Sequence, residues 1–219
     1  SSLETSPTDL ADASAFNLLT IDNPDSVESV QTGSPTVGSY SIDVNSLAAS
    51  QVLASSGFAS SSTVVGTGTL TFKIGSPTYA SGSAGAYSGF TADDTKTVTI
   101  TIDGTNNTVS GIRDAINASS VGITASLVLD GTQTRLLLTA DDSGAGTAIS
   151  VSTDDDDLDD TNSSGLSQLA YNIDSGSFVG NVTEARSSKD ASFTLNGLAL
   201  SSSSNTINNL VDGLDVTLK

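Results

Sequence analysis

The sequence predicts a mainly β protein with short helices, an α+β fold class, organised as two β-rich domains. Apolar and polar residues alternate in many short runs, which is the pattern of strands with one buried face. Ser, Thr, Gly, Asn and Asp dominate the other positions, and these residues favour turns. Only 36% of the 219 residues are hydrophobic and 5% are aromatic, which suits thin β-layers better than a large enzyme core. The length is sufficient for two such domains.

The amino-terminal region predicts a short helix followed by weakly patterned strands. Ser6 is a candidate N-cap, because it precedes Pro7 at a position where proline fits the first helical turn. Residues 16–21 then read as an extended segment, and a weak strand is expected within residues 26–37. The apolar stripe of the helix is thin, so packing contributes little to its stability.

Two clearer strands follow, and a polar stretch comes after them. Residues 40–44 alternate regularly, whereas Leu47 arrives one position out of phase, which indicates a bulge or a bend. Residues 69–74 predict a second strand with three apolar side chains on one face. Residues 75–94 are rich in Gly, Ser and Ala and include a proline, so they predict a loop or a crossing between domains.

The stretch over residues 98–151 carries the clearest local pattern. Residues 98–102 alternate as a strand, and Asp103-Gly104 predicts a turn. Thr108 is a candidate N-cap, because its hydroxyl oxygen can accept an unpaired backbone N–H of the next helical turn. Apolar residues then recur at helical spacing on one face, at Val109, Ile112 and Ile116.

A β-hairpin is expected directly after this helix. Gly122 predicts the helix end, because glycine tolerates the left-handed conformation that often follows a helix. Alternation over residues 123–129 predicts a strand. Asp130-Gly131 is a strong signal for a two-residue hairpin turn, and residues 135–139 predict the returning strand.

An acidic segment interrupts the pattern beyond the hairpin. Residues 154–160 contain six aspartates around a single leucine. Residues 167–171 predict a helical turn and residues 178–183 an extended segment. Residues 184–189 read as a charged connector.

The carboxyl-terminal part predicts a hairpin and then a unit that resembles the central helix. Asn196-Gly197 separates two short apolar runs, which is a hairpin by pattern. Residues 205–213 resemble residues 107–115, since both begin with Asn-Thr and precede an alternating strand. One interpretation is an internal repeat of a β–turn–helix–β unit, with one copy per domain. The alternative is a chance similarity between two Thr-capped helices.

Charge and composition argue against two classes of partner. The net charge is −18, and the seven Lys and Arg residues form no cluster. Nucleic-acid binding needs clustered basic side chains, and an anionic membrane surface would also repel the chain. No apolar run approaches the roughly 20 residues that a membrane-spanning helix needs. The sequence therefore predicts neither a nucleic-acid partner nor membrane insertion.

Enzymatic and metal chemistry lack their usual residues. The chain has no His and no Cys, so no nucleophile–His pair or thiol nucleophile is possible. Carboxylates leave glycoside hydrolysis open by residue type, but no Trp platform exists. Gly66 and Gly68 lack the third glycine of a dinucleotide site. An EF-hand beginning at Asp154 would need Gly and Glu where Asp159 and Gly165 stand. We therefore expect no enzyme, no metal and no cofactor, and interpret the acidic segment as a solvated loop.

The central stretch resembles a motif of a known protein family. Residues 105–117 with residues 122–126 are similar to the hook-associated "IN" motif of flagellar axial proteins, and residues 135–144 continue the match. The residues that carry the family pattern across the chain have an implied structural role: Asn107, Thr108, Ile112, Asp114, Ile116, Gly122, Asn196, Gly197, Asn205 and Thr206.

Two further segments narrow the resemblance to the flagellar filament cap family, hook-associated protein 2. Residues 190–214 resemble the start of the carboxyl-terminal half of its members, and residues 38–55 resemble their amino-terminal half. Members have a helical leg formed from both chain ends and two β-rich head domains, one inserted into the other. The resemblance therefore implies a head fragment. Its implied parts are a remnant of the leg at 1–16, a proximal head domain at 17–72 plus 190–219, and an inserted distal domain at 73–189 that carries the IN motif.

The resemblance implies a structural cap at the distal tip of the bacterial flagellar filament. Such a cap is extracellular, secreted through the flagellar export channel, and forms a ring with copies of itself. It promotes flagellin polymerisation and prevents the loss of exported subunits. Two alternatives stay open: an adhesin head that binds host glycans or surfaces, and another flagellar axial protein, either flagellin or a hook–filament junction protein.

Overall fold

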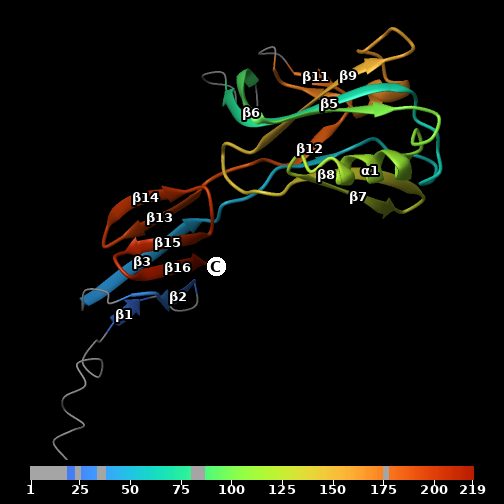
Figure 1. Cartoon of the computed structure of the whole chain (residues 1–219). Helices are drawn as coiled ribbons and strands as arrows, with labels where there is room; N and C mark the ends of the chain where they lie inside the picture. The colour runs from blue at the N-terminus through green and yellow to red at the C-terminus, as the bar shows by residue number, and fades with distance from the viewer. Residues whose placement is uncertain (1–18, 23–25, 34–37, 80–86, 175–177) are drawn as a thin grey trace, which may run out of the picture. The chain divides into compact units, whose positions relative to one another are not determined.

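The computed structural model describes residues 19–22, 26–33, 38–79, 87–174 and 178–219, which fall into two compact units (Figure 1). Unit 1 combines Ser1–Leu47 with Ala191–Lys219, and unit 2 is the intervening segment Ala48–Asp190. The second unit is therefore inserted into the chain of the first. The helix expected at Ser6 and the leg remnant expected at 1–16 lie outside the described residues.

Unit 1 contains two sheets, which confirms the mainly β class for this part. The first has the strand order β1-β3-β13-β14, with β1 parallel to β3 and the other neighbours antiparallel. The second has the antiparallel order β15-β16-β2. The strands are β1 (Leu19–Asp22), β2 (Val27–Gln31), β3 (Gly38–Ser46), β13 (Ala191–Leu195), β14 (Leu198–Ser202), β15 (Thr206–Val211) and β16 (Leu214–Leu218).

Alternating apolar residues of both sheets form the buried positions of unit 1. The predicted strand at 40–44 lies in β3, where Ile42 is buried opposite Leu195. The predicted irregularity is present as a β-bulge: Val44 pairs with Phe193 and Ser46 with Ser192, which leaves one extra residue in β3. The predicted strand at the carboxyl terminus is β16, whose buried side chains are Leu214, Val216 and Leu218.

The hairpin predicted at Asn196-Gly197 is confirmed. Both residues have positive φ, 49° and 81°, as the two central positions of a type I′ turn require, and β13 pairs with β14 through five residue pairs. The Asn196 side chain also holds β3, because its Oδ1 accepts the Ser41 N–H at 2.9 Å and its own N–H donates to the Ser41 carbonyl at 2.8 Å.

The predicted internal repeat is wrong. Thr206–Val211 is a strand, β15, and not a second copy of the central helix. Ile207 pairs with Val216, and the Thr206 and Thr217 hydroxyls are 3.2 Å apart. The neighbouring strand β16 supplies backbone partners at close range, so pairing outweighs the helical spacing of three apolar residues. The likeness to residues 107–115 is thus a similarity of sequence and not of structure.

The described part of unit 2 contains two sheets, one α-helix and one 3₁₀-helix. The sheets have the orders β11-β10-β9-β5-β6 and β12-β4-β8-β7, and each described neighbour pair is antiparallel. The elements are β4 (Val52–Ala54), β5 (Gly68–Tyr79), β6 (Tyr87–Ile102), α1 (Val109–Ala118), β7 (Ile123–Asp130), β8 (Gln133–Ala140), β9 (Ala148–Asp155), η2 (Gly165–Leu169), β10 (Tyr171–Asn172), β11 (Val179–Gly180) and β12 (Thr183–Arg186).

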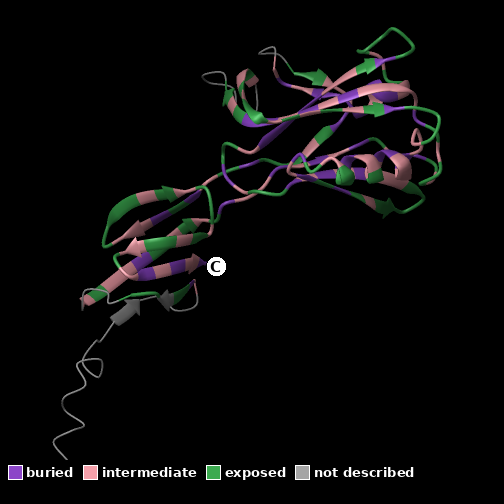
Figure 2. Cartoon of the chain, in the orientation of Figure 1, coloured by how far each residue is buried: buried purple, intermediate pink, exposed green. Residues whose placement is uncertain are grey.

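A single apolar core joins the elements of unit 2 (Figure 2). Each sheet turns one face inward, as the alternation predicted: Leu70, Phe72 and Ile74 of β5 are buried. The core includes buried residues of β4, α1, β7, β8, β9 and η2 as well. Unit 2 therefore depends on side chains from 53 to 182, and no shorter continuous stretch contains its core.

The first domain crossing lies earlier than the predicted boundary between residues 72 and 73. The segment 48–72 belongs to unit 2, because β4 pairs with β8 and β5 pairs with β9. The predicted loop over 75–94 is also wrong in large part, since β5 continues to Tyr79 and β6 begins at Tyr87. Beyond Gly75, β5 pairs with β6 only, so Pro77 occupies an edge position that tolerates a missing N–H.

The charged connector expected at 184–189 is in part a strand. Residues 183–186 form β12, which pairs with β4. Immediately after it, Ala49 and Lys189 form an isolated antiparallel bridge, with N···O distances of 2.9 and 3.0 Å. The two ends of the inserted segment therefore lie side by side within unit 2.

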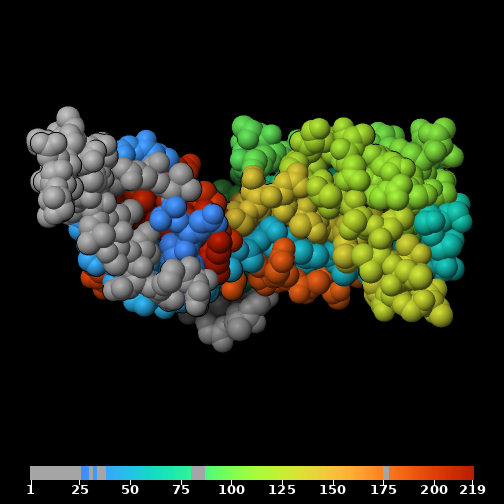
Figure 3. Space-filling view, turned by 90° about the horizontal axis from the view of Figure 1, so that it is seen from below, coloured from blue at the N-terminus to red at the C-terminus, as the bar shows by residue number. Residues whose placement is uncertain are grey.

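The helix and the β7–β8 hairpin lie at the surface of unit 2. Residues of α1, β7 and β8, yellow-green in Figure 3, make up much of the face of this unit that is turned toward the viewer. Only one face of α1 is buried, by Val109, Ile112 and Ile116.

We predict that residues 48–190, expressed alone, fold as a stable domain, because both ends meet at the Ala49–Lys189 bridge and the apolar core is complete. Circular dichroism should show β structure that is lost in one cooperative thermal transition. The matched control is the fragment 73–189, which lacks β4 and half of β5 and should not unfold cooperatively. Equal cooperativity of the two fragments would contradict the observed boundary.

Candidate functional site

The family-pattern residues predicted from the sequence divide between the two units. Asn107, Thr108, Ile112, Asp114, Ile116 and Gly122 lie in unit 2, in and around α1. Asn196, Gly197, Asn205 and Thr206 lie in unit 1. The first group forms one continuous structure, the turn before α1, the helix and its junction with β7, and is the candidate site described below.

The turn before α1 is held by side chains that fold back on the backbone. Asp103 Oδ1 accepts the Thr105 N–H at 2.8 Å and the Thr105 hydroxyl at 2.6 Å, and these hydrogen bonds hold the pKa of Asp103 below its usual value. The Asn106 amide donates to the Thr101 carbonyl and accepts the Asp103 N–H. The predicted Asp103-Gly104 turn is thus confirmed, with Asn106 as a residue that the sequence analysis did not single out.

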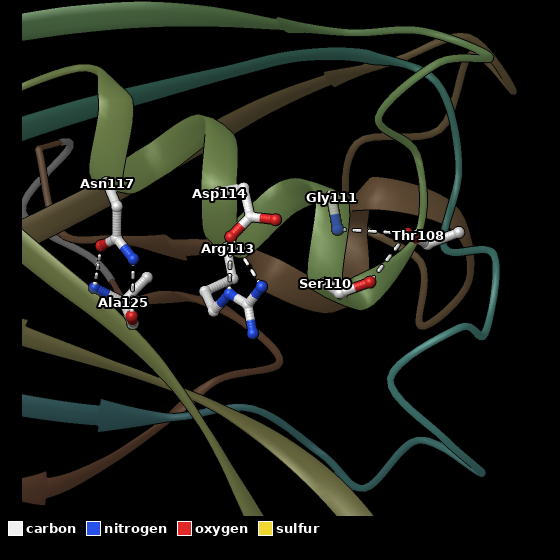
Figure 4. A network of polar contacts seen from close by, with 7 residues as sticks. All are labelled: Thr108, Ser110, Gly111, Arg113, Asp114, Asn117 and Ala125. Atoms are coloured by element: carbon white, nitrogen blue, oxygen red, sulfur yellow. Dashed lines mark hydrogen bonds and ion pairs between the residues drawn. The ribbon is translucent and has the colours of Figure 1, made fainter.

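Thr108 caps the helix as predicted. Its backbone is extended, and Oγ1 accepts the Gly111 N–H at 3.1 Å while lying 3.3 Å from the Ser110 hydroxyl (Figure 4). Two further helical N–H groups donate outside the helix, from Val109 to the Thr63 carbonyl and from Ser110 to the Ser61 carbonyl. The amino-terminal turn is therefore fully paired, partly by the distant loop 61–65.

Asn107 holds loop 61–65 against the turn before α1, and Gly111 allows this turn to pack closely against the helix. The Asn107 carbonyl accepts the Val65 N–H at 2.9 Å. A Cβ at Gly111 would lie 2.5 Å from the Asn106 carbonyl oxygen, so the turn can pack this closely only against glycine.

The buried and exposed faces of α1 have separate roles. Ile112 and Ile116 are buried in the core of unit 2, as the spacing predicted. Asp114 lies on the exposed face, where its carboxylate pairs with the adjacent Arg113 guanidinium at 2.6 Å (Figure 4). An exposed pair of this kind contributes little to stability, so Asp114 is a surface feature of the motif and not a part of its core.

The junction between α1 and β7 depends on Asn117, which was not among the predicted site residues. Its amide nitrogen donates to the Ala125 carbonyl at 3.0 Å, and its Oδ1 accepts the Ala125 N–H at 2.7 Å (Figure 4). The side chain thus pairs with β7 as a neighbouring strand would. The sequence signal was present, since Asn117 ends the matched run, but a polar helix residue usually indicates only an exposed face.

Gly122 has a left-handed backbone, with φ of 85°, but it is not the residue that ends the helix. Ser119 is the C-cap, and Ser120 with φ of 55° is the first left-handed residue. The Gly122 carbonyl accepts the Asp141 N–H at 3.0 Å. Gly122 therefore holds the residue before β7 next to the residue that follows β8.

Asn205 and Thr206 occupy the start of a strand and not a helix cap. The Asn205 carbonyl accepts the Leu218 N–H at 2.8 Å, and the Thr206 N–H donates to the Ser204 hydroxyl. These contacts close the β15–β16 hairpin. The Asn-Thr pairs of the two units thus differ in geometry, since Thr108 caps a helix and Thr206 begins a strand.

In the acidic segment, residues 154–160, the aspartate carboxylates accept hydrogen bonds from nearby backbone N–H groups. Asp155 is buried, and its Oδ2 accepts the Ser167 N–H at 3.1 Å. Asp157 and Asp159 each accept a backbone N–H two residues ahead, and Asp160 accepts the Asp155 N–H. Within the described residues, no group of three or more His, Cys, Asp and Glu side chains is arranged to hold a metal ion. In the same residues no helix is long and apolar enough to cross a membrane.

Comparison with known proteins relates the chain to flagellar proteins. No family model matches it. The B-type flagellar hook-associated protein 2 of Pseudomonas aeruginosa is 32% identical over 206 residues, which are 90% of this chain but only 39% of that relative. The flagellar hook-associated protein 2 of Escherichia coli K12 is 32% identical over 115 residues, 52% of this chain and 23% of the relative. The chain thus spans well under half of these relatives' length.

Solved structures give the same result for the fold. The D2–D3 domains of the flagellar cap protein FliD from Escherichia coli superpose with a TM-score of 0.70 at 25% identity, covering 90% of both chains. FliD from Pseudomonas aeruginosa PAO1 gives a TM-score of 0.66 at 29% identity, covering 89% of this chain and 78% of that structure. The expected mainly β head-domain fold is confirmed.

We predict that Thr108→Ala weakens the start of α1 by about 1 kcal/mol, because the Gly111 N–H loses its acceptor. Hydrogen exchange followed by mass spectrometry should show the Gly111 amide exchanging about fivefold faster. Thr108→Ser retains the oxygen and should restore slow exchange. Ser163→Ala, at an exposed loop position of the same unit, is the control. Unchanged exchange in Thr108→Ala would contradict the assigned cap.

We also predict that Asn117→Ala destabilises unit 2 by about 1–3 kcal/mol, because it leaves both backbone groups of the buried Ala125 without their partner. Asn117→Asp retains the acceptor but loses the donor, so its effect should be intermediate. Urea unfolding monitored by circular dichroism measures both changes. Equal stability of Asn117→Ala and the parent chain would show that the amide does not hold the junction.

Proposed function

We propose that this chain, a homologue of flagellar hook-associated protein 2, forms the head region of a cap at the distal tip of a bacterial flagellar filament. The observation that carries the proposal is the agreement with the FliD D2–D3 domains over 90% of both chains. It is supported by 32% identity to a hook-associated protein 2 over 90% of the chain. No feature of the described residues favours an adhesin, flagellin or hook–filament junction protein over a cap.

Within this proposal, units 1 and 2 correspond to the proximal and the distal head domain of the cap protein. Unit 1, built from two separated segments of the chain, is the proximal domain. Unit 2, inserted between its strands, is the distal domain and carries the IN motif. The insertion of unit 2 into the chain of unit 1 supports this arrangement.

The proposed cap acts mechanically. Copies of the full-length protein form a ring that prevents exported flagellin from escaping and promotes its polymerisation at the tip. The protein is extracellular and reaches the tip through the flagellar export channel. Charge supports a salt-dependent assembly, since a net charge of −18 makes copies repel one another at low ionic strength. A closed ring of identical subunits then needs complementary local contacts.

The proposal includes no catalytic step. The absence of His and Cys from the sequence supports this. Thr108 and Asn117 also point to structure, because the side chain of each binds backbone of its own unit.

Deletion of the gene that encodes this chain from its host tests the proposal. We predict bacteria with absent or short filaments that release unpolymerised flagellin, and restoration of filaments by the full-length gene. A matched gene that lacks the codons for residues 48–190 separates the contributions of the two units. Normal filaments and no released flagellin after the deletion would contradict the cap function.

A further inference from the structure

Four aromatic side chains gather at one end of unit 2, outside the candidate site. They come from the ends of β5 and β6, from β10, and from the residue before β11: Tyr79, Tyr87, Tyr171 and Phe178. Tyr87 stacks on Tyr79 with ring centroids 5.3 Å apart. Tyr171 meets Tyr87 edge to face at 6.3 Å and Phe178 at 5.1 Å. The chain has only ten Tyr and Phe residues and no Trp, so this is a marked concentration.

Three of these rings line a pocket of about 300 Å³. The remaining lining residues are Val182, Thr183 and Glu184. Tyr171 is buried at 3% exposure, whereas Phe178 is 47% exposed, so one wall is fixed in the core and the other is open to solvent. The ring of Tyr171 stands at 86° to that of Tyr87 and at 61° to that of Phe178, so the three rings line the open pocket at different angles.

A carboxylate stands in the wall of this pocket and is held in place by neutral donors. Glu184 Oε1 accepts the Gln51 amide at 2.5 Å and the Tyr87 hydroxyl at 3.3 Å. Its Oε2 accepts the Ser187 hydroxyl at 3.0 Å. Gln51 itself is fully buried, and its Oε1 accepts the Ile149 N–H at 2.6 Å. The position of the charge is therefore fixed from the core.

No cation of the described chain neutralises Glu184. All seven Lys and Arg residues lie in described segments. Five of them pair with other carboxylates, and Arg186 binds the Ser50 carbonyl and hydroxyl. Lys189 forms no ion pair with Glu184 among the contacts of the described residues. A half-buried negative charge thus faces aromatic rings without a positive partner.

The tyrosines remain neutral over the physiological range. Burial, with a smaller contribution from the Glu184 charge, raises the pKa of Tyr171 to about 12. Burial is also the main cause that raises the pKa of Tyr87, and the Tyr171 hydroxyl 2.8 Å away adds to it. Neutral rings retain the electron-rich faces that attract cations.

We infer that this pocket binds an organic ammonium cation, of the quaternary or methylated-amine class. The cation packs against Tyr87 and the exposed ring of Phe178, above the buried Tyr171, and lies beside the Glu184 carboxylate. Aromatic rings stabilise such weakly hydrated cations, and a fixed carboxylate supplies the opposite charge. A neutral ligand of the same shape would leave Glu184 without a counter-charge. A metal ion is not accommodated, because the pocket offers one carboxylate and apolar walls.

Choline chloride and its neutral isostere 3,3-dimethyl-1-butanol form a matched pair of probes for the 219-residue chain. Proton NMR of the ligand should show the choline N-methyl signal moving upfield in a saturable way, because protons above an aromatic face are shielded. The isostere should bind at least about tenfold more weakly, since it lacks the charge. Equal binding of the two probes, or no saturable shift with choline, would overturn the inference.

Substitutions of residues that line the pocket test whether choline binds there. Glu184→Gln keeps an acceptor for Gln51 but removes the charge, and should weaken choline binding about tenfold. Phe178→Ala removes the exposed ring and should reduce both the affinity and the upfield shift. The controls are Asp94→Asn, an exposed carboxylate of β6, and Leu129→Ala, an exposed apolar residue of β7, which should bind choline unchanged. Equal losses in variants and controls would show that choline binds elsewhere. Unchanged circular dichroism confirms that each variant is folded.

Discussion

The fold depends on the bridge at which the inserted segment begins and ends. Ala49 and Lys189 exchange both backbone hydrogen bonds, although 140 residues separate them in the chain. The Ala49 carbonyl also accepts the Gly144 N–H, and Asp190 accepts the Ala145 N–H. Because its two ends are fixed together, unit 2 can be inserted between β3 and β13 of unit 1 while these two strands still pair with each other. The division of the chain into two units therefore has a local physical cause.

The sequence predicted the local structure of this protein well, because local signals dominate in turns and caps. Thr108, the Asn196-Gly197 turn and the buried face of α1 each depend on residues within a few positions of one another. Strand alternation also predicted which side chains face the core, as in β5. The mainly β class followed from these patterns, whereas the relationship to the filament cap family came from the resemblance of motifs such as residues 105–117.

Long-range pairing could not be predicted in the same way. The helix implied within residues 205–213 by the internal repeat is absent and residues 206–211 form a strand, because β16 provides a partner that local spacing does not reveal. The loop expected at 75–94 contains Gly and Pro, yet β5 and β6 pair through most of it. The domain boundary at 72 and 73 was misplaced for the same reason, since β4 and β5 find their partners in β8 and β9. Asn117 was missed because its function depends on the backbone of β7.

The motif around α1 fixes how the helix joins the elements before and after it. Around α1, side chains replace missing backbone partners at two points: Thr108 at the helix start and Asn117 at the junction with β7. Asn196 does the same beside β3 in unit 1. Such contacts fix how short elements meet when few aromatic residues are available to fill a core. A strongly acidic chain agrees with the proposed mechanical role, and the aromatic pocket beside Glu184 is where we infer that an organic cation binds.

The central claim is that this chain belongs to a cap at the filament tip. Immunogold electron microscopy of intact flagella, with antibodies raised against the 219-residue chain, tests it most directly. The account predicts gold particles at the distal end of each filament and none along its length. Label along the whole filament, at the junction with the hook, or only on the cell surface would contradict it.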